Sequence, residues 1–431
     1  MNKKAWGHVS ILAILFAVTM PAAIAGHSSL SGSTLPGSPP AQSTPDDQAW
    51  PIQPGAEDGP GALFFPGQPL DPLEVAWNGL DVREQRLFTQ LSRVFGVFAD
   101  YHPQIWREGR YRLDQTPLLF VYRDAQNQHP FAFLINHPDP QALNTTLLPL
   151  DKRLGLPPVY QLTDDSLLES LDTRLFFDFG YDVAGHSTFV MFYRDASIDA
   201  FQSADYWDFS YFLAHEVFHR YQLITAKWQI PPDSTQDTAQ YPLTAQNLSL
   251  ALLEDRILAA GMAANTPDEK ARALQQFLAV RQERIRQDDL IQRLENNQEV
   301  AEGTARYIEY RLLDLMAEDS EILQPPLVSL AQSSEPIQMG YPMTIEELRD
   351  SFAWGRPYTS GAVLGLLLDS VGISWHERVE NGETFVDILL REFPLKDDAP
   401  EDMLRSAQAE YDYASILESV TAYLEKLQQT E

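Results

Sequence analysis

Two histidines four residues apart carry the clearest chemical signal in the chain. They lie in the segment Phe212–Tyr221, whose sequence is FLAHEVFHRY. In an α-helix, side chains four residues apart project from one face, so the imidazoles of His215 and His219 can reach a single cation. Glu216 lies ~100° round the helix from His215, where it can contact a water on that cation without being a ligand. The spacing predicts a hydrolytic zinc site; the alternative is a packed helix with two solvated histidines.

A catalytic zinc needs a third protein ligand and one open position for water. The chain contains no cysteine, so that ligand must be a histidine or a carboxylate. A third histidine six residues after His219 completes one known arrangement, but that position is Thr225. The remaining common arrangement takes a glutamate from a second helix.

The helical pattern over 299–316 supplies that glutamate, and Glu302 is the predicted ligand. Small residues surround it on this helix: Ala301, Gly303 and Ala305. Glycine inside a helix costs about 1 kcal/mol relative to alanine, so a close approach to the histidine helix would explain it. Glu299, one turn away on the same side, is the alternative ligand. Glu309, two turns on, either hydrogen-bonds to a ligand or faces solvent.

The pairing of His215-Glu216-x-x-His219 with the later Glu302-Gly303-x-Ala305-x-Tyr307 resembles the gluzincin group of zinc metallopeptidases. The resemblance covers roughly residues 185–370. It implies a zincin-like catalytic region in which His215, His219 and Glu302 bind one Zn²⁺ per chain. It also implies that Glu216 is the general base.

Two further roles follow from the resemblance. The segment Gly185–Tyr193 would be the edge strand that lines the substrate, and Tyr358 resembles the tyrosine that several gluzincins use to stabilise the oxyanion. The alternative for Tyr358 is a side chain packed at the start of a helix. The segment 185–191 carries no glutamate to anchor a substrate's free amino group, which favours an endopeptidase. A helical insertion over 247–294 would either gate the cleft or form a rigid wall.

The elements that position these residues follow from hydrophobic periodicity. Apolar residues at three- and four-residue spacing predict a helix over Asp81–Tyr101. Short apolar runs predict two strand pairs: Leu118–Tyr122 with Phe131–Ile135, and Leu175–Phe179 with Thr188–Tyr193. We expect a small antiparallel sheet subdomain with a helix on it.

From Tyr206 onward the pattern is almost entirely helical. A helix is predicted over Tyr206–Thr225, and Thr266-Pro267-Asp268-Glu269 supplies an N-cap, a first-turn proline and a capping-box glutamate. Further helices are predicted over 299–316, 358–368, 385–392 and 413–429. The expected fold class is therefore α+β, with the sheet subdomain followed by a mainly helical catalytic region.

Length and charge limit the classes of function. The chain has 431 residues, enough to bury a sizeable core. It contains 61 acidic residues against 31 lysines and arginines, a formal net charge of −30. Such a surface repels phosphate groups, so we expect no nucleic-acid partner and no docking on an anionic membrane.

The first 60 residues predict a leader followed by a tether. Two lysines, an apolar stretch over 9–20 and small residues before Gly26 form the layout of a signal peptide cut after Ala25. The apolar stretch is shorter than the ~20 residues that a spanning helix needs, so we expect no membrane span in the mature chain. Residues 26–60, rich in Ser, Pro and Gly, predict a disordered linker.

The expected division is therefore a signal peptide over 1–25, the linker over 26–60, an α+β part with the edge strand over 61–200, and a helical part over 201–431. The sequence predicts a secreted or periplasmic zinc metallopeptidase, more specifically an endopeptidase, acting on a peptide or protein substrate. One alternative is an inactive peptidase-like scaffold, against which Glu216 argues, because losing that residue is the simplest route to inactivity. The other is a zinc hydrolase of a non-peptide amide or ester.

Overall fold

The computed structural model describes residues 77–122, 132–150, 152–171, 177–193, 209–226, 228, 238–316, 330, 337, 343–394 and 399–429. The predicted signal peptide and linker lie outside these residues, as do the first residues of the strand predicted at Leu175 and of the helix predicted at Tyr206. Among the described helices, none is both long enough and apolar enough to span a bilayer.

The described part of the chain is α+β, with its strands in the first half and helices dominating the second. The strands are β1 (Leu118–Tyr122), β2 (Ala132–Ile135), β3 (Thr145–Leu147), β4 (Val159–Leu162), β5 (Phe177–Val183) and β6 (His186–Tyr193). The helices of the first half and centre are α3 (Val82–Ile105), α4 (Asp165–Ser170), α6 (Phe209–Arg220), α8 (Ala245–Ala263), α9 (Pro267–Gln287) and α10 (Leu290–Leu315). The C-terminal helices are α12 (Ile345–Asp350), α13 (Arg356–Ser370), α14 (His376–Glu380), α15 (Phe385–Glu392), α16 (Ala399–Glu410) and α17 (Tyr413–Gln428).

The six strands form one sheet in the order β3-β4-β2-β1-β6-β5. Both predicted hairpins are present, because β1 pairs antiparallel with β2 and β5 pairs antiparallel with β6. Two expectations are wrong. The sheet is mixed rather than antiparallel, since β1 and β6 run parallel. The strand predicted to form the edge, over 185–193, lies inside the sheet, whose two edge strands are β5 and β3.

Strand β1 is apolar along its whole length because both faces of the sheet are covered. Leu118, Phe120 and Tyr122 belong to the main core, together with the apolar residues of α3 and α6. Leu119 and Val121 face a second, smaller core that includes Leu168 and Leu171, from and just after α4. A strand buried on both sides loses the alternation of apolar and polar residues, which is why its sequence is a continuous apolar run.

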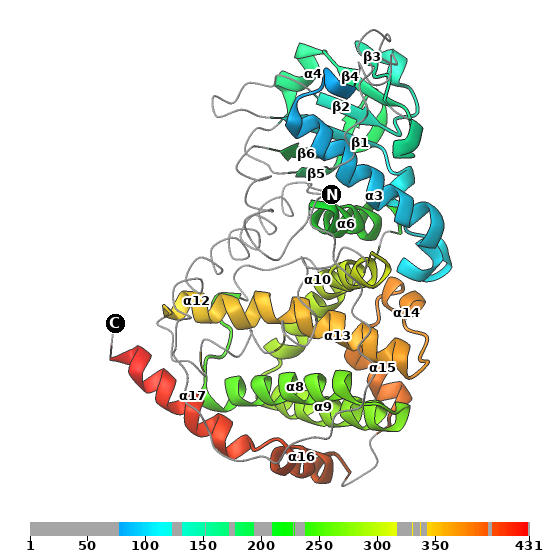
Figure 1. The fold of residues 1–431 in the computed structure, drawn as a ribbon. Helices are drawn as coiled ribbons and strands as arrows, with labels where there is room; N and C mark the ends of the chain where they lie inside the picture. The colour runs from blue at the N-terminus through cyan, green and yellow to red at the C-terminus, as the bar shows by residue number, and fades with distance from the viewer. Residues whose placement is uncertain are drawn as a thin grey trace, which may run out of the picture.

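Helices α6, α10, α13, α8 and α9 form successive layers below the sheet (Figure 1). Helix α3 crosses the sheet, and α6 contacts α3 and β5 on one side and α10 on the other. Helix α10 packs along α13, and α13 contacts α8, which pairs with α9. Helices α16 and α17 contact α9 and α8 at the far end of the molecule.

Most predicted helices are present, with their boundaries shifted by a few residues. Helix α9 begins as predicted after Thr266, whose side chain accepts from the backbone N–H of Glu269 in a capping box. The helix predicted over 299–316 is the second part of α10, which already begins at Leu290. Helices α12 and α16 were not predicted, since one is short and the other has few apolar residues.

Three buried arginines join the helices of the lower layers. Arg281 and Arg284 of α9 and Arg356 of α13 are each at most 2% exposed. Their guanidinium groups bind the carboxylates of Glu254 and Asp255 on α8 and of Glu295 and Glu299 on α10. The predicted insertion over 247–294 is therefore part of the packed helical body.

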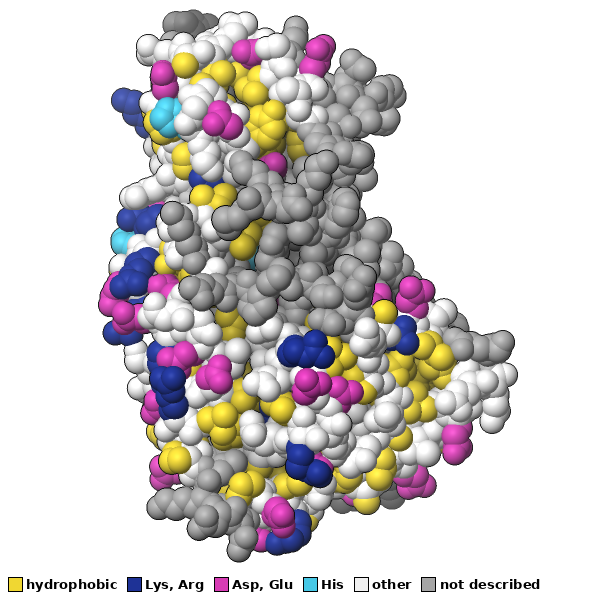
Figure 2. All heavy atoms as spheres, turned by 180° about the vertical axis from the view of Figure 1, so that it is seen from behind, with side chains coloured by type: hydrophobic (Ala, Val, Ile, Leu, Met, Phe, Trp, Pro, Cys, Tyr) yellow, Lys and Arg dark blue, Asp and Glu magenta, His cyan; other side chains and the backbone are white. Residues whose placement is uncertain are grey.

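Charged side chains of both signs are interspersed on the face shown in Figure 2. Several of the basic residues in the described part of the chain pair with a nearby carboxylate, such as Arg405 with Asp402 and Arg378 with Glu392. Pairs of this kind on an exposed surface contribute little to stability.

Candidate metal centre

Helix α6 carries the two histidines that are predicted to bind the metal, and it lies in the middle of the molecule. All 12 of its residues are buried, because the sheet and α3 cover one side and α10 covers the other. The hydroxyl of Tyr111 donates a 2.7 Å hydrogen bond to the carbonyl oxygen of Ala214, directly before His215. The apolar residues of α6 thus pack the helix against its neighbours on both sides. Its polar side chains are buried as a result and need hydrogen-bond or ionic partners.

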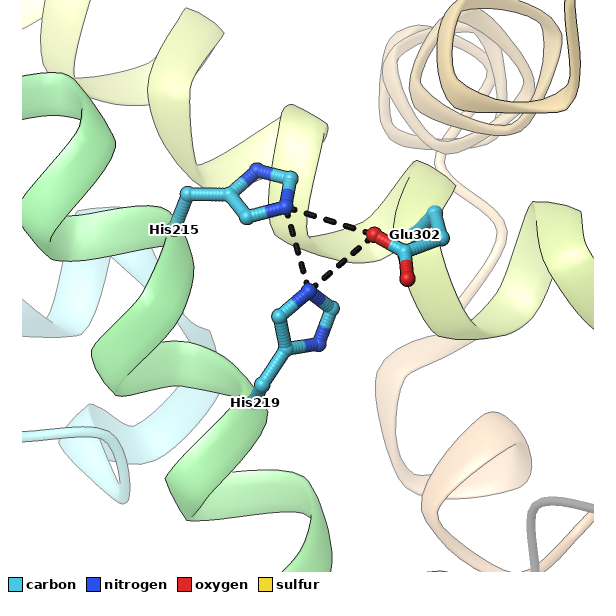
Figure 3. Close-up of side chains that lie close together, drawn as sticks. All are labelled: His215, His219 and Glu302. Carbon is cyan, nitrogen blue, oxygen red and sulfur yellow. Dashed lines mark hydrogen bonds and ion pairs between the residues drawn. The ribbon is translucent and has the colours of Figure 1, made fainter. Parts of the chain in front are cut away.

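His215, His219 and Glu302 meet between α6 and α10 (Figure 3). Their Nε2, Nε2 and Oε2 atoms form a triangle with edges of 3.1, 3.3 and 3.1 Å. Ligands bound tetrahedrally at zinc distances of ~2.0–2.1 Å are about 3.3 Å apart, so the triangle has the size of one face of such a site. This is the only group of three or more potential ligands that converges among the described residues.

The histidines are held by polar partners on their other ring nitrogens. His215 Nδ1 lies 2.6 Å from Oε1 of Glu309, whose other oxygen binds Arg306. His219 Nδ1 lies 2.8 Å from Oε1 of Gln222. Both acceptors require the hydrogen to be on Nδ1, which leaves the two Nε2 lone pairs facing the carboxylate of Glu302. Three lone-pair atoms this close together need a cation, or protons, between them.

The surroundings of the histidines favour protons on their rings. Burial lowers the pKa of His215, but hydrogen bonds to Glu302 and Glu309 outweigh burial and raise it to about 10. The pKa of His219 is raised as well, since the charge of Glu302 outweighs its burial. Burial acts against Glu302, yet the two histidines hold the pKa of its carboxyl far below the usual range.

Glu216 lies next to the cluster and outside the triangle. The residue is 3% exposed, and its Oε2 atom has no hydrogen-bond partner among the described residues. Burial raises the pKa of this carboxyl to about 7, against the opposing effect of His215 and His219. A buried carboxylate oxygen without a hydrogen-bond partner normally lowers the stability of the fold. Such an oxygen beside the two Nε2 atoms and Oε2 of Glu302 suits a side chain that accepts and donates a proton.

Tyr358 reaches the cluster from α13. Its ring is stacked on the ring of His215 at 5.9 Å and 7°. Burial, followed by the charge of Glu302 and a hydrogen bond to that carboxylate, raises the pKa of Tyr358 well above its usual value. The phenol therefore stays protonated and can donate a hydrogen bond, and its ring lies against a residue of the cluster although it stands in the first turn of α13.

The alternative ligand Glu299 has other partners. Its two carboxylate oxygens accept from the guanidinium of Arg281 at 2.8 and 2.9 Å. Oε1 also accepts from the hydroxyl of Ser360 at 2.6 Å. The structure thus places Glu302 at the histidines and Glu299 in the arginine network.

Two glycines let α13 come close enough to bring Tyr358 to the cluster. A Cβ added at Gly303 would lie 2.6 Å from the Cα of Gly361, and one added at Gly361 would collide with the carbonyl oxygen of Glu299. The packing reason expected for Gly303 is therefore contact with α13, not with the histidine helix.

The edge strand β5 lies beside the cluster. The ring of Phe179 is edge-on to His219, with centroids 5.9 Å apart. Arg220 donates to the carbonyl oxygens of Phe179 and Ser187, which ties the end of α6 to the β5–β6 hairpin. The edge of the sheet is thus next to the predicted metal ligands, although the strand at this edge is β5 and not the one predicted.

Two polar residues of the site had no assigned role in the sequence. Gln222 lies three residues after His219, and Arg306 lies four residues after Glu302. Helical neighbours at these spacings share a face, so spacing could have suggested both. Glu309 was expected to make a hydrogen bond or to face solvent, and the first of these is correct.

Comparison of the chain with protein-family models, with curated proteins and with solved structures found no match.

Proposed function

We propose that the protein is a zinc-dependent hydrolase of peptide bonds. The observation that carries the proposal is the convergence of His215 Nε2, His219 Nε2 and Glu302 Oε2, 3.1–3.3 Å apart, beside the unpartnered carboxylate oxygen of Glu216. Two imidazoles and one carboxylate are a ligand set of catalytic zinc, and harder cations such as Mg²⁺ prefer oxygen ligands alone.

Each residue of the site has a role in such a hydrolysis. When bound, zinc supplies a hydroxide nucleophile at neutral pH and polarises the scissile carbonyl. Glu216 accepts the proton of the attacking water and passes it to the leaving amine. Tyr358, held as a neutral phenol, donates a hydrogen bond to the carbonyl oxygen as negative charge develops on it. Glu309 and Gln222 keep the histidines in the required tautomer.

The residues of the edge strand β5 favour an endopeptidase over an exopeptidase. β5 carries no glutamate, and its two aspartates are engaged within the hairpin. Asp178 accepts from the N–H of Gly180 at 2.8 Å, and Asp182 accepts from the N–H of Gly185 at 2.9 Å. Both carboxylates are therefore engaged within the hairpin, which argues against either of them anchoring a substrate's amino terminus.

The test combines metal analysis with peptides that are acetylated at one end and amidated at the other. We expect about one zinc per chain and internal cleavage of such blocked peptides. Glu216→Gln should keep the zinc and lose turnover by about 10²–10⁴-fold, because the amide cannot accept the proton.

Three results would contradict the proposal. Full turnover by the Glu216→Gln protein would remove Glu216 from its role as base. Hydrolysis of amide or ester substrates without any peptide cleavage would favour the non-peptide hydrolase. A zinc-loaded protein inactive on all three substrate classes would favour the scaffold.

A further inference from the structure

Gln222 connects the helix that carries the histidines to the helix that carries Glu302. It lies in a π-helical turn, Tyr221–Thr225, that continues α6, and it is 1% exposed. Its Oε1 atom lies 2.8 Å from His219 Nδ1. Its Nε2 atom donates to the carbonyl oxygen of Ala301 and to the hydroxyl oxygen of Thr304, both at 2.8 Å.

The hydrogen bonds of this amide have only one consistent direction. The hydroxyl hydrogen of Thr304 is donated to the carbonyl oxygen of Val300 at 2.6 Å, so this hydroxyl can only accept from Gln222. The carbonyl of Ala301 can also only accept. Both amide hydrogens of Gln222 must therefore point to α10, and its oxygen must face His219.

The orientation of the amide decides the tautomer of His219. Facing an amide oxygen, Nδ1 must carry a hydrogen, and Nε2 is then the nitrogen that can bind a metal. A carboxylate at position 222 could accept from His219, but it could not donate to Ala301 and Thr304. An amide of this length satisfies both sides at once.

We propose that Gln222 is a positioning residue of the metal centre. It holds His219 in the Nδ1–H tautomer and fixes the spacing between α6, with its two histidines, and α10, with Glu302. The inference rests on the metal centre proposed above, and it adds a requirement for an amide at position 222.

The experiment compares Gln222→Met, which keeps the length of the side chain but removes all three hydrogen bonds, with Gln222→Glu, which keeps only the acceptor. Gln276→Met is the matched control: Gln276 is also 1% exposed, but it bonds to Glu410 and Tyr411, away from the histidines. Thr304→Val keeps the shape of Thr304 and removes one acceptor of the amide. It serves as a milder variant if Gln222→Met fails to fold.

Zinc affinity is measured by competition with a chromophoric chelator, and the imidazole tautomers of the zinc-loaded proteins by ¹⁵N NMR. We expect Gln222→Met to bind zinc about 10–100-fold more weakly and to lose the protected Nδ1–H signal of His219. Gln222→Glu should keep that signal and still bind more weakly than wild type, and Thr304→Val should weaken binding by a smaller factor. Gln276→Met should match wild type in both measurements.

Unchanged zinc affinity and an unchanged Nδ1–H signal in Gln222→Met, or unchanged affinity in Thr304→Val if the former does not fold, would overturn this inference and leave the metal centre standing. A wild-type protein that binds no zinc would overturn both. Equal losses in Gln222→Met and Gln276→Met would also overturn it, since the loss would then reflect general stability.

Discussion

Burial acts in opposite directions on neighbouring side chains of α6. It raises the pKa of Glu216 to about 7, because a charged carboxylate is costly away from water. It would lower the pKa of His215, but Glu302 and Glu309 lie close enough to raise it to about 10 instead. The same buried helix thus holds a weakened acid beside strengthened bases, an arrangement typical of functional sites.

Glu302 and Glu299 lie one turn apart on α10, and their partners predict opposite effects of substitution. Glu302→Ala should largely abolish zinc binding, because the third ligand is lost. Glu299→Ala should keep one zinc per chain but destabilise the fold by about 3 kcal/mol, because Arg281 loses a buried partner. Metal analysis and thermal unfolding of the two variants check this. If Glu299→Ala lost the zinc and Glu302→Ala kept it, Glu299 and not Glu302 would be the third ligand.

The pKa values also predict how metal binding depends on pH. A raised folded-state pKa for His215 stabilises the metal-free protein below its unfolded value of ~6.5, and this stabilisation is lost as pH rises through about 10. The raised pKa of Glu216 acts in the same direction between its unfolded value of ~4.5 and about 7. Zinc must displace the protons between the ligands, so its affinity should rise over the same range.

The expected result is that the melting temperatures of zinc-loaded and metal-free protein move apart between about pH 6 and about pH 9. Thermal unfolding with and without zinc across this range measures the difference. Glu302→Ala is the control, because a chain that binds no zinc should show no difference at any pH. If the difference in melting temperature between zinc-loaded and metal-free protein became smaller as pH rises, zinc would not be displacing protons from the ligands.

At the scale of elements, the site depends on how closely α10 and α13 pack. Glu302 precedes Gly303 on one helix, and Tyr358 lies three residues before Gly361 on the other. The two glycines are in contact, so Glu302 and Tyr358 meet only while the backbones of α10 and α13 remain this close. The Glu299–Ser360 hydrogen bond supports the packing from the adjacent turns.

Gly303→Ala should therefore destabilise the protein by about 1–3 kcal/mol, because its methyl group overlaps the backbone of α13. It should also weaken zinc binding as Glu302 shifts. Gly96→Ala on α3 is the control: a Cβ there meets no atom within 4 Å, so this change should stabilise by about 0.5–1 kcal/mol. Thermal unfolding of both variants measures the effects. Equal stability of the two would contradict the close packing.

At the scale of the whole molecule, the buried arginine network joins the lower helices to α10, the helix that carries Glu302. Arg281 makes hydrogen bonds to Glu254, Asn296 and Glu299 with its side chain fully buried. Each charge of the network is costly to bury alone and stable only with its partners in place. The network thus makes the position of α10 depend on α8, α9 and α13.

Arg281→Met should cost about 3–5 kcal/mol of unfolding free energy, because carboxylates are left buried without their partner. Arg405→Met removes an exposed pair with Asp402, whose side chains are 68% and 69% exposed, and should change stability by less than about 0.5 kcal/mol. Denaturant unfolding of both proteins compares them. If Arg281→Met lowered the unfolding free energy by less than about 1 kcal/mol, water or a shift of the neighbouring helices would be compensating the carboxylates that lose their partner.

The sequence by itself determined the features that depend on neighbouring residues. The spacing of His215, Glu216 and His219, the capping box at Thr266 and the apolar strand runs are local patterns, and each predicts its element from helix or strand periodicity. Glu302 was favoured over Glu299 by its small neighbours, although those neighbours pack against α13 and not against the histidine helix.

Only the tertiary structure decided features that depend on which elements meet. The order of strands puts β5 at the edge and makes β1 and β6 parallel, because long-range pairing sets strand order and the periodicity of a single strand does not record it. Likewise, Glu299 and Glu302 share one helix and one residue type. What separates them is the partner each meets, Arg281 for one and the two histidines for the other, and helix packing alone brings those partners into contact.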